Sequence, residues 1–436
     1  MADYPQFDLR LQQQRLTPLE RQRALRLDRD ALGSLQLDKL NRMLAGVLPH
    51  CPFYQDKYGC TEKQLQSLEQ LVELPLLTKS ELVDPTPGSP ARFHYLPRQR
   101  YVRFHQTSGT SGRPMPVLDS AADWQWWIDT WQFVLDAAQV TADDTVAMAF
   151  SFGPFIGFWS AHDAIVDRQA LVIPAGGMST TARLQLILHG AATVLCCTPT
   201  YALHLADVAA KEGLDLAGSR VARIIVAGEP GGSIPEVRQR IEQAWGARVI
   251  DHSGASELGP WGVGAVDGSG LYVIESEFIV ETLRPGSEQP ADEGELAELV
   301  LTGLGRWGGP AIRYRTGDLV RVQTDHDHDS RFRFLPGGVL GRADDMLVIR
   351  GVNVFPSGVE SVVRSIDGLG EFRMIATRVE SMDQLEIDVE GSGQAAARLA
   401  AELQIRLGLR IPVRAVPADT LPRSEAKSRR LDDRRR

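Results

Sequence analysis

A run of hydroxyl side chains and glycines near residue 110 is the part of this sequence best suited to bind a polyphosphate. It reads Gln106-Thr107-Ser108-Gly109-Thr110-Ser111-Gly112-Arg113-Pro114. Glycine lets backbone N–H groups approach phosphate oxygens closely, and the Ser and Thr hydroxyls add uncharged donors. The spacing differs from the G-x-x-x-x-G-K-[ST] loop of the P-loop NTPases. Such a run alone is more often a surface loop, so a nucleotide site also requires suitable groups further along the chain.

Three later segments carry groups that could complete a nucleotide site. They are Ala227-Gly228-Glu229-Pro230-Gly231-Gly232, Asp251-His252-Ser253-Gly254-Ala255-Ser256-Glu257 and Tyr314-Arg315-Thr316-Gly317-Asp318-Leu319. The first is a glycine-rich turn after an expected strand, where open parallel sheets bind ligands. The carboxylate of Glu257 could hold Mg²⁺ against phosphate oxygens. The carboxylate of Asp318 could accept hydrogen bonds from both hydroxyls of a ribose, and we expect it at the start of a strand.

The elements that must position these groups form an α/β pattern. Residues 8–84 have helical spacing, which predicts a helical N-terminal segment. Short apolar runs then alternate with helical patterns, as is typical of a largely parallel sheet; they cover 145–150, 170–173, 193–196 and 223–227. From about Leu271 the intervening helices disappear, which predicts a mostly antiparallel β subdomain that includes a strand at 272–274.

The end of the chain predicts a separate, smaller α+β domain. Helical patterns lie near 357–366 and 394–407, and strand patterns near 372–378 and 384–389. We therefore expect a large N-terminal domain over residues 1–340, opened by the helical segment 1–84, and a small mobile C-terminal domain over 341–436.

Composition excludes several classes of protein. The chain has 436 residues, of which 43% are hydrophobic and 24% charged, as in ordinary globular proteins. A formal net charge of -9 argues against a broad nucleic-acid surface. The first 30 residues are polar, with no apolar signal core, so we expect a cytoplasmic enzyme that binds no membrane. The cysteines form no C-x-x-C pair and are predicted to be reduced thiols.

In their order and content, these segments resemble the acyl-adenylating, AMP-forming ligase superfamily, and within it the phenylacetate-CoA ligase-like branch. Four motifs match: Thr107–Pro114 resembles the phosphate loop, Ser253–Glu257 the Y-G-x-T-E motif, Tyr314–Leu319 the Y-R-T-G-D-L motif, and Gly341–Glu360 the hinge and its loop. Pro52-Phe53-Tyr54 and Leu74-Pro75-Leu76-Leu77-Thr78-Lys79 resemble the opening half of that branch. The resemblance covers nearly the whole chain, and four ordered motifs are more specific than one.

The resemblance implies an ATP site made of several groups of residues. Those that would bind the phosphates and Mg²⁺ are Ser108, Gly109, Thr110, Ser111, Gly112, Ser256 and Glu257. Those that would lie around the adenosine are Gly228, Glu229, His252, Ser253, Asp318 and Arg342. Lys427 matches the family's mobile lysine, whose ammonium would offset the charge that develops when a carboxylate attacks the α-phosphate.

Two positions depart from the family pattern. The tyrosine that normally presents a ring to adenine is Ser253 here, so another ring such as that of His252 would serve, or stacking would be lost. The glycine before the mobile lysine is Ala426, a change that only a positive φ would forbid. We expect activity to survive the second change.

The resemblance also implies two half-reactions and a small aromatic acid as substrate. A carboxylate would attack ATP to give an acyl-adenylate and pyrophosphate, and a thiol would then displace AMP. Between the steps the C-terminal domain would turn about Asp344 and bring the loop of Arg350, Gly351 and Val352 to the thiol. The acid pocket would include Phe152, Phe155 and Gly254, and benzoate, phenylacetate and anthranilate would all fit such a pocket.

The function expected from the sequence is therefore that of an AMP-forming aryl-acid:CoA ligase with Mg-ATP and CoA as co-substrates. The acyl group could instead pass to the pantetheine thiol of a carrier protein or to an amine. An inactive nucleotide-binding regulator fits less well, because a binder needs neither Glu257 nor Lys427. We also expect a homodimer, from the frequency of symmetric dimers and from the resemblance.

Two other features are predicted to be structural. Trp124, Trp127 and Trp131 fall on one helical face, as packing residues do. His326-Asp327-His328 lies in a polar loop without further fixed ligands, so we do not expect it to bind a metal.

Overall fold

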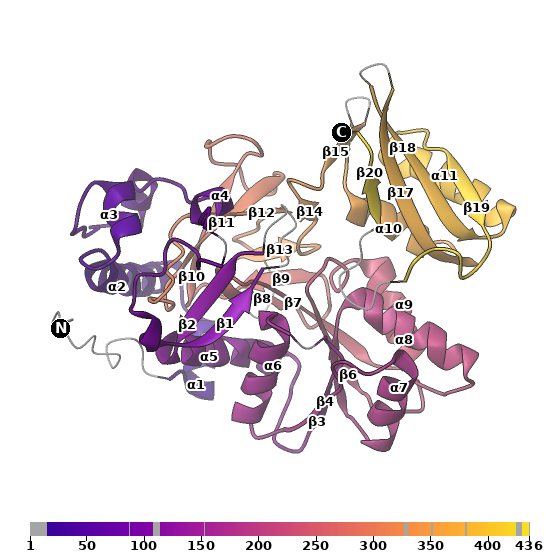
Figure 1. Ribbon diagram of the computed structural model, residues 1–436, viewed down its shortest axis with the longest axis horizontal. Coiled ribbons are helices and arrows are strands. Elements are labelled where there is room, and N and C mark those ends of the chain that lie inside the picture. Colours follow the sequence, from indigo (N-terminus) through magenta and orange to yellow (C-terminus); the bar gives the residue numbers. More distant parts are fainter. Residues whose placement is uncertain are drawn as a thin grey trace.

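The computed structural model has a large N-terminal part and a smaller C-terminal part, which lie next to each other in Figure 1. It describes residues 15–86, 88–107, 114–151, 153–326, 330–349, 352–379, 382–423 and 430–435.

In the described residues 15–84, the N-terminal segment is built from short helices and loops. It contains α1 (Pro18–Ala24), α2 (Arg29–Val47), α3 (Pro52–Tyr58), the 3₁₀ turn η2 (Leu68–Glu73) and α4 (Lys79–Leu82). The Asp28 side chain caps α2, and a capping box of Thr78 and Glu81 begins α4, which explains where these helices start. A short 3₁₀ turn η3 (Arg98–Arg100) leads into a hairpin of β1 (Tyr101–Gln106) and β2 (Pro116–Ser120).

An eight-stranded sheet forms the centre of the molecule, in the order β13-β9-β8-β7-β6-β5-β3-β4. The parallel strands are β3 (Thr145–Met148), β4 (Leu171–Pro174), β5 (Val194–Cys197), β6 (Arg223–Ala227) and β7 (Arg248–Ala255). The helices between them are α6 (Ile156–Asp167), α7 (Thr180–His189), α8 (Pro199–Lys211) and α9 (Pro235–Trp245). Because these strands are parallel, the turns after β6 and β7 lie at the same edge of the sheet.

Three antiparallel strands extend this sheet: β8 (Gly259–Gly264), β9 (Gly270–Val273) and β13 (Phe334–Pro336). A second sheet contains β10 (Phe278–Leu283), β11 (Ala297–Gly303), β12 (Tyr314–Val320) and β14 (Gly341–Arg342), all antiparallel. The antiparallel subdomain is thus confirmed, but the strand expected at 272–274 begins earlier and belongs to the large sheet. Asp318 lies inside β12 and pairs with Arg342, so its expected place at the start of a strand was wrong.

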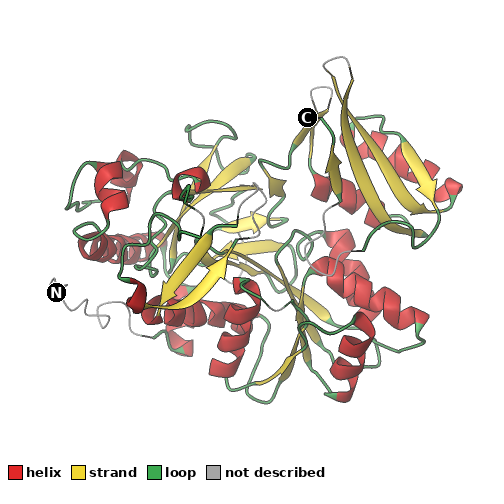
Figure 2. Ribbon diagram, viewed as in Figure 1, coloured by secondary structure: helices red, strands yellow, loops and turns green. Residues whose placement is uncertain are grey.

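The C-terminal part builds a hydrophobic core of its own, whose members include Leu347, Val363, Ile387 and Leu403. A hairpin of β15 (Leu347–Ile349) and β16 (Val352–Val354) precedes α10 (Pro356–Arg364) and α11 (Gly393–Leu407). The sheet order is β19-β18-β17-β20, from β17 (Leu369–Val379), β18 (Met382–Gly391), β19 (Val413–Val416) and β20 (Leu431–Asp433). Both helices pack against this sheet (Figure 2).

The tryptophans of α5 (Ala121–Ala137) are core residues, as predicted from their spacing. Trp124, Trp127 and Trp131 are all buried, and α5 packs against β8 and α6. Cys196 and Cys197 are buried free thiols at the end of β5. In the described ranges, no helix combines the length and apolar character that crossing a membrane requires.

Candidate functional site

A buried carboxylate with two polar partners lies in the turn between β7 and β8. Glu257 is 5% exposed, and its Oε1 atom accepts a hydrogen bond of 2.6 Å from the hydroxyl of Tyr314 on β12. The ammonium of Lys79 at the start of α4 lies 3.3 Å from the same oxygen. Three distant parts of the sequence therefore meet at one oxygen atom.

The backbone of the N-terminal segment explains how Lys79 reaches this position. Leu77 runs parallel to Tyr314: its N–H donates to the carbonyl of Arg313 at 2.8 Å, and its carbonyl accepts from Arg315 N–H at 2.8 Å. The segment thus continues the second sheet by one residue pair. Lys79 lies two residues further on and begins a helix, so its side chain extends toward Glu257 with its position set by the strand pairing.

The electrostatic surroundings keep Glu257 ionised. Burial alone would raise the pKa of this carboxyl, but the ammonium of Lys79 and the hydroxyl of Tyr314 hold the pKa below its usual value. Magnesium in nucleotide sites is usually bound by one or two carboxylates together with phosphate oxygens. A single buried, ionised carboxylate fits that requirement, so Glu257 is suited to hold Mg²⁺.

A buried arginine connects the Glu257 turn to the hairpin. Arg306 is 1% exposed and donates to the carbonyl of Ser256 at 2.8 Å. Its Nε atom lies 2.8 Å from Oδ1 of Asp119 at the end of β2, and His105 on β1 lies 3.5 Å from the other carboxylate oxygen. We call Arg306, Asp119 and His105 the buried brace. Sequence reasoning missed it, because no local motif marks these residues.

The described hairpin residues Thr107 and Met115 flank the expected phosphate loop. Thr107 and Met115 pair across the end of the hairpin, with Thr107 N–H donating to the Met115 carbonyl at 3.0 Å and Met115 N–H donating to the Thr107 hydroxyl at 3.1 Å. The predicted phosphate-binding residues Ser108, Gly109, Thr110, Ser111 and Gly112 lie outside the described residues.

The glycine-rich turn after β6 follows the strand end as predicted. Gly228 and Gly231 have φ values of 95° and 156°, which glycine adopts readily. The Glu229 carboxylate accepts from Thr200 N–H at 2.9 Å, at the start of α8. A Cβ atom at Gly232 would lie 2.6 Å from the Asp251 carboxyl carbon, so the turn packs closely on β7. The carboxylate expected near adenine therefore also caps a helix.

Asp251, in the middle of β7, is buried and hydrogen-bonded. It accepts from the Ser233 hydroxyl at 2.6 Å and from His252 N–H at 2.9 Å. Burial raises its pKa to about 6, and the hydrogen bonds from Ser233 only partly offset that effect. This carboxyl therefore titrates close to neutral pH.

The ring of His252 does not support the expected role in stacking on adenine. The side chain is 6% exposed, packs edge-on against Trp131 with ring centroids 4.6 Å apart, and bonds through Nδ1 with the Gly262 carbonyl at 2.8 Å. Neighbouring residues on a strand point to opposite faces, so His252 cannot replace a ring at position 253. Ser253 itself is partly exposed and offers only a hydroxyl.

The predicted ribose-binding residues do come together. Arg342 on β14 donates to Asp318 on β12 at 3.2 Å, and its Nε atom donates to the exposed carboxylate of Asp344 at 2.9 Å. The expected hinge residue thus contacts the expected ribose site directly. Any rotation about Asp344 would have to break or rebuild the contact between Arg342 and Asp344.

The expected acid pocket is described only in part. Gln106 N–H donates to the Pro154 carbonyl at 2.8 Å, which holds the segment before α6 beside the phosphate-loop hairpin. Phe155 follows Pro154 as the N-cap residue of α6 and is 45% exposed. A Cβ atom at Gly254 would lie 3.0 Å from the Gly259 carbonyl, so this position requires a small residue. Phe152 lies outside the described residues.

Three residues predicted to act through the C-terminal domain also lie outside the described residues: Lys427, Arg350 and Gly351. Val352 is the first residue of β16, directly after that loop. Their roles remain predictions.

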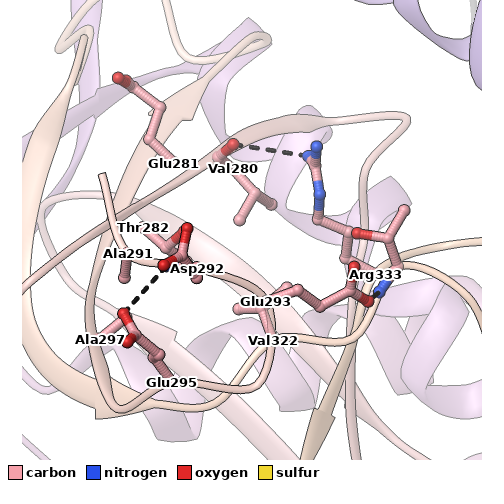
Figure 3. A pocket seen from close by; sticks show the side chains of 11 residues that line it. Val280, Glu281, Thr282, Ala291, Asp292, Glu293, Glu295, Ala297, Val322 and Arg333 are labelled. Carbon is pink, nitrogen blue, oxygen red and sulfur yellow. Dashed lines mark hydrogen bonds between the residues drawn. The ribbon is translucent and has the colours of Figure 1, made fainter.

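A separate surface cavity of about 180 Å³ lies in the antiparallel subdomain (Figure 3). Its wall includes Asp292 and Glu295, which both pair with Arg284, and Arg333, which donates to the Val280 carbonyl at 3.5 Å. Clustered carboxylates repel a polyphosphate, and none of the site residues above lines this cavity. It is not the nucleotide site.

Comparison with known proteins agrees with this geometry. Residues 351–435 match the family described as AMP-binding enzyme C-terminal domain. The chain is 31% identical to a phenylacetate-coenzyme A ligase of Pseudomonas putida, over 93% of this chain and 95% of that one. It is 30% identical to a phenylacetate-coenzyme A ligase of Escherichia coli (strain K12), over 93% and 95% of the two chains.

A solved structure of 2-hydroxyisobutyryl-CoA ligase in the postadenylation state, with its adenylate bound, superimposes with a TM-score of 0.86 at 28% identity, covering 92% of this chain and 90% of that one. The same relative in the thioesterification state, with adenylate and CoA, gives a TM-score of 0.67 at 28% identity over 97% and 91% of the chains. The identities to the ligases of Pseudomonas putida and Escherichia coli extend over nearly the full length of each chain. The chain therefore belongs to the phenylacetate-coenzyme A ligase family of adenylate-forming enzymes.

Proposed function

We propose that this protein is an AMP-forming acid:CoA ligase that activates a small aromatic carboxylic acid with Mg-ATP. The observation that carries the proposal is the meeting of Glu257, Lys79 and Tyr314 in a turn that Arg306 connects to the β1–β2 hairpin. The relatives of this chain over nearly its full length include phenylacetate-coenzyme A ligases. A protein that only bound a nucleotide would not need a buried, ionised carboxylate at this point.

The reaction has two steps that use the same site. In the first, the substrate carboxylate attacks the α-phosphorus of ATP, the bond to the bridging oxygen breaks, and pyrophosphate leaves. In the second, the CoA thiol loses its proton and attacks the acyl carbon, and AMP leaves with the bonding electrons. A carboxylate is already an adequate nucleophile, so the residues of the chain act by positioning and by stabilising charge.

Each described site residue has a part in the first step. Glu257 would hold Mg²⁺, which would neutralise part of the triphosphate charge. Lys79 is 35% exposed at its side chain and can turn from Glu257 toward a phosphate oxygen. Asp318 and Arg342 would hold the ribose. Lys427 would stabilise the charge that develops on the α-phosphate.

The choice of an aromatic acid rests on the names of the sequence relatives and on Phe155 near the phosphate-loop hairpin. The structural relative is named as a ligase of 2-hydroxyisobutyrate, a short branched acid, so this class is a second candidate. The two classes differ in size and in their flat or branched shape. A direct comparison of the two acids as substrates distinguishes them.

The test is mass spectrometry of products from purified protein incubated with Mg-ATP, CoA and a panel of single acids. The panel contains benzoate, phenylacetate, anthranilate, a hydroxybenzoate and 2-hydroxyisobutyrate. We expect an aryl-CoA thioester together with AMP. A thioester from 2-hydroxyisobutyrate alone would move the substrate to the second class. Absence of adenylate and thioester with every acid would refute the ligase function.

The acceptor of the acyl group is tested in the same experiment. Accumulation of acyl-adenylate without thioester would indicate a carrier-protein thiol or an amine as the natural acceptor. We also propose a homodimer, supported by the prevalence of two-fold symmetric oligomers, and light scattering during gel filtration measures it. The use of ATP and CoA supports a cytoplasmic location, which fractionation of the source cells would test.

A further inference from the structure

In the described residues, charged and polar side chains of the C-terminal domain contact α8 and α9 of the large domain. Figure 1 shows these two helices directly below the C-terminal domain. Glu236, in the first turn of α9, accepts from the Ser361 hydroxyl of α10 at 2.8 Å and from Arg406 of α11 at 3.1 Å. One carboxylate thus binds both helices of the C-terminal domain, one with each oxygen.

Two further contacts cross the same boundary. Lys211, the last residue of α8, pairs with Asp419 at 2.9 Å, with both side chains more than 60% exposed (62% and 61%). Arg430 is 8% exposed, pairs with Glu360 at 2.7 Å inside the C-terminal domain, and reaches the Thr200 hydroxyl at 3.5 Å. Among these contacts, Glu236 is the side chain that binds two separate helices across the boundary.

Solved structures of 2-hydroxyisobutyryl-CoA ligase show a postadenylation state, an open conformation and a thioesterification state. This structure superimposes better on 2-hydroxyisobutyryl-CoA ligase in its postadenylation state than on the same protein in its thioesterification state. Glu236 therefore binds the C-terminal domain in an arrangement like the postadenylation one. A contact made in only one of two arrangements shifts the equilibrium toward that arrangement by the free energy of the contact.

We propose that Glu236 is a positioning residue that favours the adenylate-forming arrangement of the two domains over the thioester-forming one. The proposal rests on the ligase function proposed above. The described contacts of Glu236 include none of the residues of the nucleotide site, so it acts through the position of the C-terminal domain. Loss of its charge should slow adenylate formation relative to thioester formation without changing the site itself.

The test compares Glu236→Gln with Glu402→Gln. Glu402 lies one turn before Arg406 on α11 and pairs with the same arginine at 3.5 Å, but within its own domain. Each of the two variants thus removes one carboxylate partner of Arg406. We expect Glu236→Gln to lower the ratio of the adenylation rate to the thioesterification rate by about threefold to tenfold, and Glu402→Gln to leave it unchanged.

The rates are measured separately, as pyrophosphate release in a single turnover and as thioester formed from purified acyl-adenylate. The charge swap Glu236→Arg with Arg406→Glu should restore the parental ratio, which a merely destabilised protein would not do. Equal ratios in the parent and in Glu236→Gln would overturn the proposal.

A second readout needs no substrate. Cysteines at Lys211 and Asp419, in a Cys60→Ser background, report the distance across the boundary through the rate of cross-linking by a short bismaleimide. We expect Glu236→Gln to slow this cross-linking and Glu402→Gln to leave it unchanged. If the parent forms no acyl-adenylate, the ligase function fails while this readout still decides the role of Glu236. Equal cross-linking rates in Glu236→Gln and Glu402→Gln would contradict the proposed role of Glu236.

Discussion

At the scale of single residues, Lys79 has the clearest consequence for chemistry. Its ammonium is the nearest described cation to Glu257 and holds the pKa of that carboxyl below its usual value. Lys79→Met keeps most of the side-chain volume and removes the charge. We expect adenylate formation to slow on the order of 100-fold, and the acidic limb of the pH-rate profile to move to higher pH, because the pKa of Glu257 rises. Pyrophosphate release between pH 5 and 9 measures both effects.

Lys63→Met is the control for this variant, because Lys63 pairs with Glu73 at 3.1 Å and has no described contact with Glu257. Its rate and pH profile should match those of the parent. A Lys79→Met protein with the parental acidic limb would show that Lys79 does not set the ionisation of Glu257.

Asp251 gives a prediction about stability. Its pKa is raised to about 6 by burial, from an ordinary value near 4 in the unfolded chain. A raised carboxyl pKa favours folding at low pH and costs stability as pH rises through the folded pKa. Asp251→Asn removes that cost. We therefore expect the variant to exceed the parent in free energy of unfolding at pH 8 by at most about 3 kcal/mol, with the difference disappearing near pH 4.

Urea unfolding of both proteins at pH 4, 6 and 8 checks this. Asp215→Asn is the control, because Asp215 lies in an exposed turn before β6 and accepts a hydrogen bond from the backbone N–H of Gly218. A constant difference between Asp251→Asn and the parent at all three pH values would mean that the ionisation of Asp251 does not affect folding.

At the scale of elements, the buried brace connects the β1–β2 hairpin to the turn that carries Glu257. Removing one member of a buried ion pair leaves the other charge uncompensated and typically costs about 3–5 kcal/mol. We expect Arg306→Met to lose about this much stability, and Arg306→Met with Asp119→Asn to recover part of it. Urea unfolding measures both variants, and a loss below about 1 kcal/mol in Arg306→Met would rule out the brace as a stabilising contact.

The order of the elements was accessible from the sequence because each is marked locally. The strand ending at Ala227 precedes a glycine-rich turn, and Asp318 and Arg342 lie in motifs that the pairing of β12 with β14 brings together. The contacts of Lys79 with Glu257 and of Arg306 with the Ser256 carbonyl were not accessible, because they join segments far apart in the sequence. The stacking role of His252 was the weakest expectation, since strand alternation alone places residues 252 and 253 on opposite faces.

At the scale of the whole molecule, the C-terminal domain joins the large domain beside the predicted ribose-binding residues. The C-terminal core begins at Leu347, while Arg342 and Asp344 just before it pair with each other. We therefore expect any motion of the C-terminal domain to change the contacts of Arg342. In the proposed function, one site would serve two reactions only if the C-terminal domain moved from one arrangement to another between the steps.

Fixing the two domains in the present arrangement should separate the two reactions. Cysteines at Lys211 and Asp419, joined by a short bismaleimide, would hold α8 against the C-terminal domain where the native pair lies 2.9 Å apart. We expect the cross-linked protein to release pyrophosphate once and to retain its acyl-adenylate. Thioester formation should fall at least about tenfold, since the loop at Val352 cannot reach the thiol. The two single-cysteine variants, treated identically, should complete both steps. Normal thioester formation in the fully cross-linked protein would mean that this chain performs both reactions without moving its C-terminal domain.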